Sequence, residues 1–264
     1  MSAAAARAVF ISGSAGGLGR ALVRRFYQGG WQVIAQLRAP NEDFTQFCES
    51  LYAKEEGDSQ ELSSRGERLN AGGVIEPLYF DLTDSPAREQ ALRELISRKV
   101  PLKALINNAA VAHGGFFQMT PLEAVRAVFE VNFFAALALT QGLLRLLRRQ
   151  GGGSVVNIGS IAGLDLSAGN CAYGVSKAAL LAFTRTLAAE TAGSGIRVNA
   201  VAPGLLNTGM GSQTESKAAA QMLERSALHR KGEPQEVAEV VYFLCQDEAS
   251  LINGEIVRTD GGRA

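Results

Sequence analysis

Short apolar runs alternate with longer segments of helical periodicity along nearly the whole chain, and this alternation restricts the possible fold most strongly. The runs have the length and composition of buried strands. They are Val9–Ile11, Gln32–Leu37, Ile75–Phe80, Ala104–Ile106, Ser154–Ile158, Arg197–Val201 and Glu255–Val257. Strands that alternate with helices form a parallel sheet covered by helices on both faces. The sequence therefore predicts an α/β fold. No break in composition and no repeat divides the chain, so we expect one domain over residues 1–264.

The helical segments between these strands differ in how much apolar surface they carry. They are expected at Leu18–Phe26, Phe44–Leu51, Pro86–Lys99, Val125–Leu147, Tyr173–Ala192 and Pro234–Leu244. Val125–Leu147 is apolar on more than one face, which suggests a subunit contact. Residues 41–73 predict one helix and a mobile surface loop, without any assigned role.

Composition narrows the class of protein. Lysine plus arginine equals aspartate plus glutamate, 26 each, so no dominant basic face for nucleic acid is expected. Three widely spaced cysteines fit reduced thiols in a cytoplasmic protein, and they fit neither a disulfide framework nor a metal site. Met1–Ala6 lacks the pattern of a secretory signal, and Phe133–Leu147 is too short for a membrane span.

A glycine-rich segment joins the first predicted strand to the first predicted helix. It reads Gly13-Ser-Ala-Gly-Gly17-Leu-Gly19, with the spacing G-x3-G-x-G. Glycines at such a junction let the backbone approach a diphosphate at the helix N-terminus, where N–H groups and the helix dipole favour an anion. The position predicts a dinucleotide site, although a glycine-rich loop alone is weak evidence for one.

Arg38 and Asp81 follow the second and third strands. In a dinucleotide-binding fold, the first of these positions meets the adenosine ribose. An acidic residue there binds the ribose hydroxyls, whereas an arginine suits a 2′-phosphate. Arg38 therefore favours NADP(H) over NAD(H), with a solvent-exposed arginine as the alternative. Asp81 either accepts a hydrogen bond from an adenine amino group or caps the helix that follows.

Tyr173 and Lys177 are four residues apart, so they share one face if the segment is helical. A lysine cation at ~4 Å, with an effective dielectric of about 20, lowers a phenol pKa by roughly 3 units. The pair is suited to exchanging a proton with an alcohol or carbonyl oxygen. The same spacing also occurs by chance, when a surface tyrosine lies beside a solvated lysine.

Together these motifs resemble those of the short-chain dehydrogenase/reductase family, over nearly the full chain. They occur in the order Ser12–Gly19, Asn107–Ala110, Asn132, Ser160, Tyr173 with Lys177, and Pro203–Thr208. The second motif departs from the family's Asn-Asn-Ala-Gly because Ala110 replaces the glycine. The segment from Asp247 to Gly262 is similar to the end of reductases that act on 3-oxoacyl thioesters.

The resemblance implies a Rossmann-like, doubly wound sheet of seven parallel strands and roles for four residues. Tyr173 would transfer the proton, and Ser160 would hydrogen-bond the substrate oxygen. Lys177 would hold the nicotinamide ribose, and Asn132 would anchor a water that links Lys177 to solvent. The implied cofactor-binding residues are Gly13, Ser14, Gly17, Leu18, Gly19, Arg38, Asp81, Leu82, Asn108, Ala109, Tyr173, Lys177, Pro203, Gly204, Leu206 and Thr208.

The expected activity is NADPH-dependent reduction of a ketone, of 3-oxoacyl type or a related carbonyl, to a secondary alcohol, with NAD(H) as the alternative cofactor. Oxidation of a secondary alcohol, sugar or steroid and non-catalytic sensing of NADP(H) are the alternatives. The substrate is expected to be a small molecule, with thioesters among the candidates, held by Met210–Leu228 and Leu164–Asn170. Ser194 stands where some acyl-carrier-protein reductases have a docking arginine, which puts such docking in doubt.

The resemblance also implies a homotetramer or homodimer. The helices near Val125–Leu147 and Gly174–Ala192 are expected in the interface, because both carry more apolar residues than one buried face needs.

Overall fold

A computed structural model of the protein describes residues 7–62, 73–212 and 216–262. Its centre is a seven-stranded sheet in the order β3-β2-β1-β4-β5-β6-β7, with every neighbouring pair parallel. The strands are β1 (Ala8–Ile11), β2 (Gln32–Leu37), β3 (Val74–Tyr79), β4 (Leu102–Asn107), β5 (Gly153–Ile158), β6 (Ile196–Pro203) and β7 (Ile256–Thr259). The order runs outward from β1 in both directions, which confirms the predicted doubly wound α/β fold.

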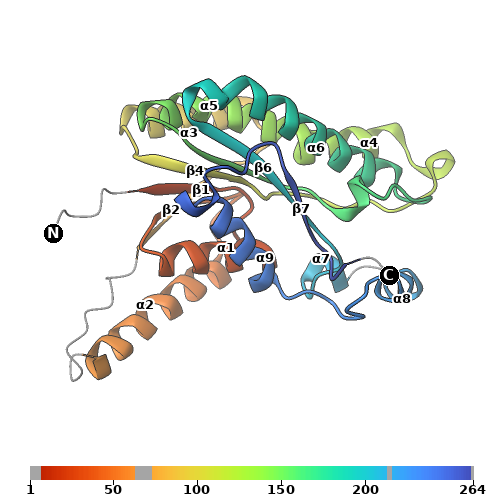
Figure 1. Ribbon diagram of the computed structural model, residues 1–264, viewed down its shortest axis with the longest axis horizontal. Helices are drawn as coiled ribbons and strands as arrows, with labels where there is room; N and C mark the ends of the chain where they lie inside the picture. Colours follow the sequence, from red (N-terminus) through yellow and green to blue (C-terminus); the bar gives the residue numbers. More distant parts are fainter. Residues whose placement is uncertain (1–6, 63–72, 213–215, 263–264) are drawn as a thin grey trace.

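Helices cover both faces of the sheet (Figure 1). One face carries α1 (Gly17–Gln28), α2 (Glu42–Leu62) and α9 (Pro234–Leu244). The other face carries α3 (Ser85–Ser97), α4 (Leu122–Phe129), α5 (Ala135–Arg149) and α6 (Cys171–Thr191). Two short helices, α7 (Gly209–Ser212) and α8 (Ser216–Glu224), lie beyond the carboxyl ends of β6 and β7. Each face has its own apolar core, so the central strands are buried on both sides, whereas the edge strands β3 and β7 are partly exposed.

The segment between β2 and β3 contains the predicted helix, but the helix is longer than the apolar pattern around Phe44–Leu51 indicated. It spans Glu42–Leu62, and Phe44 and Leu51 bury its inner face. The loop predicted for the rest of this segment lies in residues 63–72, outside the described residues.

The predicted helix at Val125–Leu147 is confirmed and extends further at both ends. A π-helical turn, Glu130–Phe134, joins α4 to α5, so one continuous helix runs over Leu122–Arg149. By length and composition this helix is long enough to cross a membrane, and 39% of its most apolar stretch is buried in the protein. We expected Phe133–Leu147 to be too short to span a membrane, and this expectation was wrong about length because the helix extends over Leu122–Arg149. Its contacts with β4, α3 and α6 account for part of its apolar surface.

A buried hydrogen-bond network ties this helix and α6 to the middle of the sheet. Asn107 Nδ2 donates to Asn157 Oδ1 at 2.7 Å and to Thr140 Oγ1 at 3.0 Å. Asn157 Nδ2 donates in turn to Thr184 Oγ1 at 2.9 Å. Buried polar groups are costly without partners, so the network fixes how α5 and α6 lie on β4 and β5. Ser160, one of the residues predicted to be catalytic, follows the carboxyl end of β5, and α6 carries Tyr173 and Lys177.

Candidate active site

Ser160 and Tyr173 meet at the carboxyl end of β5. Ser160 leaves the strand in an extended conformation and caps a short 3₁₀ turn, because its Oγ accepts a hydrogen bond from the N–H of Ala162 at 3.1 Å. This acceptor role leaves the hydroxyl proton of Ser160 free to be donated elsewhere. Tyr173 lies in the first turn of α6, half-buried, and its hydroxyl pairs with Ser160.

The pKa of Tyr173 is raised above its ordinary value. Burial is the main cause, and the hydrogen bond with Ser160 opposes it only in part. The prediction that Lys177 depresses this pKa is therefore wrong for the structure as it stands. The lysine is on the expected face of α6, with Nζ 5.9 Å from the centre of the tyrosine ring. At that distance the removal of the phenol from water outweighs the attraction of the cation.

Lys177 is almost fully buried, and its ammonium points at the backbone of β5. Nζ donates to the carbonyl oxygen of Ile158 at 2.7 Å. Burial lowers the pKa of Lys177 from 10.5 to about 8. At neutral pH the group thus remains charged next to the phenol, although the protein interior disfavours that charge.

Asn132 lies in the π-helical turn and is also buried. Its Oδ1 accepts from Val111 N at 2.8 Å, and its Nδ2 donates to Val111 O and to Ser176 Oγ, both at 3.0 Å. The amide therefore fastens the loop after β4 to the helix that carries Tyr173. The predicted role in holding a water for Lys177 stays a prediction.

The glycine-rich loop has the geometry expected for an anion site. Gly13 has φ +66°, a conformation that favours glycine. The N-cap residue of α1, Gly16, makes no side-chain cap, and the first turn has no acidic residue. The helix N-terminus is thus open to an anionic ligand. A Cβ at Gly17 would lie 2.9 Å from Thr208 Cγ2, so the close approach of Thr208 requires glycine there.

The Asn107–Ala110 motif holds this loop to the neighbouring strand. The N–H groups of Asn108 and Ala109 donate to Ser12 Oγ at 2.9 and 3.0 Å. Asn108 Nδ2 also donates to the carbonyl oxygens of Ser12 and Gly13. The predicted residues Asn108 and Ala109 therefore lie against the loop, and the Ser12 hydroxyl joins β1 to β4.

Two of the predicted cofactor-binding side chains face the core instead. Ser14 is fully buried and its Oγ donates to Ile11 O at 2.9 Å. Leu82 is buried in the apolar cluster beneath α3 and α5. Leu18 packs partly against the other cluster. For Ser14 and Leu82, whose side chains are buried, only the backbone could contact a ligand.

Sequence reasoning missed Gln36, which links three strand ends. This buried side chain accepts a hydrogen bond from Gly13 N at 3.0 Å and donates one to Phe80 O at 2.8 Å. It thereby fixes the glycine loop relative to β2 and β3. The available signal was a glutamine within an otherwise apolar, fully buried strand, because such a group requires partners.

Arg38 and Asp81 lie together at the carboxyl ends of β2 and β3. Arg38 Nε is 2.7 Å from Asp81 Oδ2, and the arginine side chain is 85% exposed. Thr83 holds the aspartate by its N–H and hydroxyl, and these bonds, with a smaller contribution from Arg38, lower the pKa of Asp81. Asp81 thus stabilises the turn after β3, but Asp84 is the N-cap of α3, so the alternative that Asp81 caps this helix was wrong. Asp81 also keeps the guanidinium at the predicted ribose position.

The segment after β6 closes the remaining side of the site. Leu206 forms an isolated bridge with Gly232, and Asn207 N donates to Gly232 O at 2.9 Å. Gly204 packs against Asp260 at the end of β7. Pro203 ends the strand at this edge, so the predicted Pro203–Thr208 motif runs from β6 to the glycine loop.

Comparison with known proteins decides the family. Residues 13–264 match the family model described as enoyl-(acyl carrier protein) reductase. The 3-oxoacyl-[acyl-carrier-protein] reductase FabG of Thermotoga maritima is 33% identical, over 96% of this chain and 95% of that protein. The chain is a short-chain dehydrogenase/reductase.

Other members of the short-chain dehydrogenase/reductase family differ widely in what their names describe. Protein FixR of Bradyrhizobium diazoefficiens is 36% identical, over 97% of this chain and 86% of that protein. A solved structure of a candidate NAD(P) dependent gluconate 5-dehydrogenase from Beutenbergia cavernae has NADP bound at low occupancy. It has a TM-score of 0.81 and 27% identity, covering 98% of this chain and 96% of that one. The protein is thus an oxidoreductase of a family that binds NAD(P) and acts on small molecules.

Proposed function

We propose that this short-chain dehydrogenase/reductase reduces a ketone, of 3-oxoacyl type or a related carbonyl, to a secondary alcohol with NADPH. The observation that carries the proposal is the pairing of Ser160 with Tyr173, whose pKa burial raises. A raised pKa keeps the phenol protonated at neutral pH, which is the state that can donate a proton to a carbonyl oxygen. A screen of ketones that follows NADPH consumption tests it.

Each side chain of the site has a distinct task in this proposal. The nicotinamide cofactor supplies the hydride. Ser160 donates a hydrogen bond to the carbonyl oxygen, where negative charge develops, and Tyr173 donates the proton. The Lys177 cation stabilises the phenolate that this transfer leaves behind. The open N-terminus of α1 fits the diphosphate of the cofactor, and Thr208 closes over Gly17 beside it.

The reverse reaction, oxidation of a secondary alcohol, is the second candidate. It uses the same residues but needs the phenolate form of Tyr173 as the base. The relative described as a gluconate 5-dehydrogenase favours this direction for a sugar acid. The raised pKa of the phenol keeps it protonated in the free site, which is the form from which reduction starts.

Arg38 is the proposed determinant of NADPH preference. A 2′-phosphate next to Arg38 would replace the carboxylate of Asp81 as partner of the guanidinium. Charge-assisted hydrogen bonds contribute about 1.5–3 kcal/mol. We expect Arg38→Gln to weaken NADPH binding by about 10-fold or more and to leave NADH binding nearly unchanged. Fluorescence titration of both nucleotides measures the two constants, and equal losses for both would contradict the assignment.

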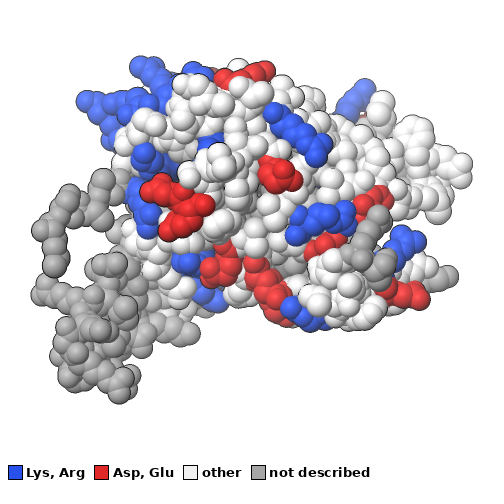
Figure 2. All heavy atoms as spheres, viewed as in Figure 1, with Lys and Arg blue, Asp and Glu red and all other residues white. Residues whose placement is uncertain are grey.

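We further propose that the protein forms a homo-oligomer through α4, α5 and α6. Phe134 and Val175 lie on these helices and are 50% and 43% exposed. Figure 2 shows that the lobe formed by the loop before α4 and the start of α4 has few charged side chains. Light scattering at micromolar concentration should give a mass of at least two chains, and a monomer would refute this assembly.

A further inference from the structure

A cavity is lined by residues close in sequence to Ser160 and Tyr173 and by the segment that contains α8. Its volume is 120 Å³. Ile161 and Asn170, which flank the two catalytic candidates in sequence, line one wall, and Leu205 and Met222 line the opposite one. The cavity thus joins the two segments that the sequence predicted to hold the substrate.

The cavity admits only a short molecule. An apolar cavity of about 150 Å³ holds one benzene molecule, so this cavity accommodates a group of similar or smaller size. Arg258 also lines it, from β7. Arg258 Nη2 is 2.9 Å from Asp165 Oδ2, and Arg258 Nε donates to Asp260 Oδ2 at 3.0 Å. These two ion pairs join β7 to the loop after β5.

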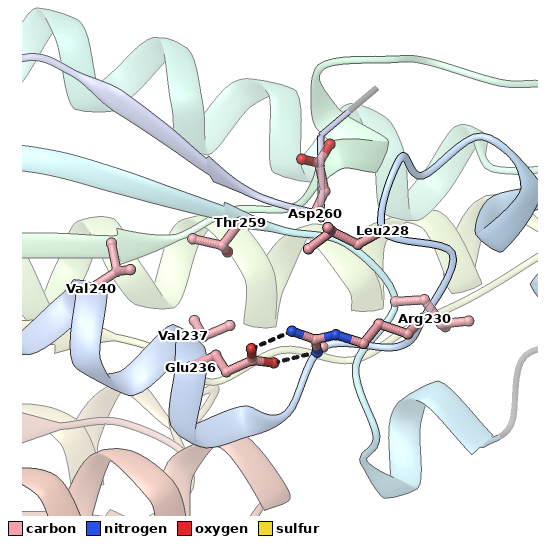
Figure 3. A pocket seen from close by; sticks show the side chains of 10 residues that line it. Leu228, Arg230, Glu236, Val237, Val240, Thr259 and Asp260 are labelled. Atoms are coloured by element: carbon pink, nitrogen blue, oxygen red, sulfur yellow. Dashed lines mark hydrogen bonds and ion pairs between the residues drawn. The ribbon is translucent and has the colours of Figure 1, made fainter. Parts of the chain in front are cut away.

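Three arginines line the cavity, and two of them have carboxylate partners. Arg258 is bound by Asp165 and Asp260. Arg230 forms a bidentate pair with Glu236, at 2.6 and 2.8 Å, as Figure 3 shows. Both guanidiniums are therefore neutralised within the protein.

The third arginine, Arg225, is different. It lies directly after α8, on the wall formed by Met222 and its neighbours. Within residues 7–62, 73–212 and 216–262 it forms no ion pair with a carboxylate. An arginine guanidinium binds a carboxylate through two parallel hydrogen bonds. Among the side chains that the structure describes, Arg225 is therefore the arginine of this cavity without a carboxylate partner.

We propose that the substrate is a short oxo acid whose carboxylate binds Arg225 while its ketone faces Ser160 and Tyr173. This inference rests on the proposed function, because Tyr173 marks the position of the reacting carbonyl. The size of the cavity favours such a compound over a long-chain 3-oxoacyl thioester. The substrate class is thereby narrowed from ketones in general to small anionic ones.

Acetoacetate and methyl acetoacetate test the proposal, since they carry the same ketone and differ in the charge of one group. Wild-type protein should reduce the acid with a kcat/KM at least about 10-fold above that of the ester, because a hydrogen bond to a charged group contributes this much. Arg225→Gln should lower the acid-to-ester ratio by about 10- to 100-fold, and Arg225→Lys should restore part of it. Arg93→Gln, an exposed substitution on α3, should leave the ratio unchanged.

An ester turned over as well as the acid, an unchanged ratio in Arg225→Gln, or a faster reaction with a 3-oxooctanoyl thioester would overturn the proposal. Binding of the same two compounds to Tyr173→Phe protein, measured by calorimetry with NADP⁺ present, separates this proposal from the proposed function. Acid binding that depends on Arg225, without turnover by any variant, would remove the reductase function and keep the substrate class. Turnover of ketones without a preference for the acid would keep the reductase function and remove the proposed substrate class.

Discussion

Tyr173→Phe is expected to lower kcat for ketone reduction at least about 100-fold, because a positioned general acid contributes ~10²-fold or more. The phenyl ring keeps the packing of the tyrosine in the first turn of α6 and loses only the hydroxyl that pairs with Ser160. Steady-state kinetics with NADPH and a ketone measure the effect.

Two controls make this result specific to proton transfer. NADPH affinity of the variant should stay within a few-fold of wild type, since the phenol is not needed to hold the diphosphate. Cys171→Ala, two residues earlier on the same helix, should retain most of the activity. More than about a tenth of wild-type turnover in Tyr173→Phe would remove the tyrosine from its assigned role.

Lys177 should make folding stability depend strongly on pH above neutrality. Its pKa is about 8 in the folded protein and near its ordinary 10.5 in the unfolded chain. Below pH 8 both states carry the ammonium, and burying it costs roughly 3 kcal/mol, at about 1.4 kcal/mol per pKa unit. Between pH 8 and 10.5 the unfolded chain binds more protons than the folded one, so stability rises with pH and the cost disappears.

Lys177→Met removes the titrating ammonium. The difference in the free energy of unfolding between wild type and variant therefore isolates the contribution of Lys177. From pH 7 to 10.5, the free energy of unfolding of wild type minus that of the variant should increase by about 3 kcal/mol. Urea denaturation at both pH values measures it, and groups common to both proteins cancel. Lys99→Met, at an exposed residue, should give a difference that stays flat. A flat or falling difference for Lys177→Met would show that the lysine is not buried as a cation.

The sequence predicted best the features that depend on residues close together in the chain. Alternating apolar runs located all seven strands to within a few residues, because the central strands are buried on both faces and must be apolar. The i, i+4 spacing placed Tyr173 and Lys177 on one helix face, as helix geometry requires. The family motifs indicated Ser160 as the partner of Tyr173, although thirteen residues separate them.

Local sequence patterns could not predict properties that depend on packing between distant segments. The pKa of Tyr173 moves upward because neighbouring elements exclude water from it, which spacing along one helix does not reveal. Gln36 acts through Gly13 and Phe80, which come from different strands. Arg230 and Arg258 have carboxylate partners, and Arg225 has none among the described side chains. This difference depends on contacts between distant segments and is visible only in the fold.

The most direct test of the central claim is a stoichiometric assay of NADPH consumed against secondary alcohol formed, on a panel that includes acetoacetate. Catalytic reduction predicts one alcohol for each NADPH over many turnovers, and loss of both signals in Tyr173→Phe. Tight binding of NADPH without any alcohol from the whole panel would contradict it, and would instead favour a protein that senses the nucleotide.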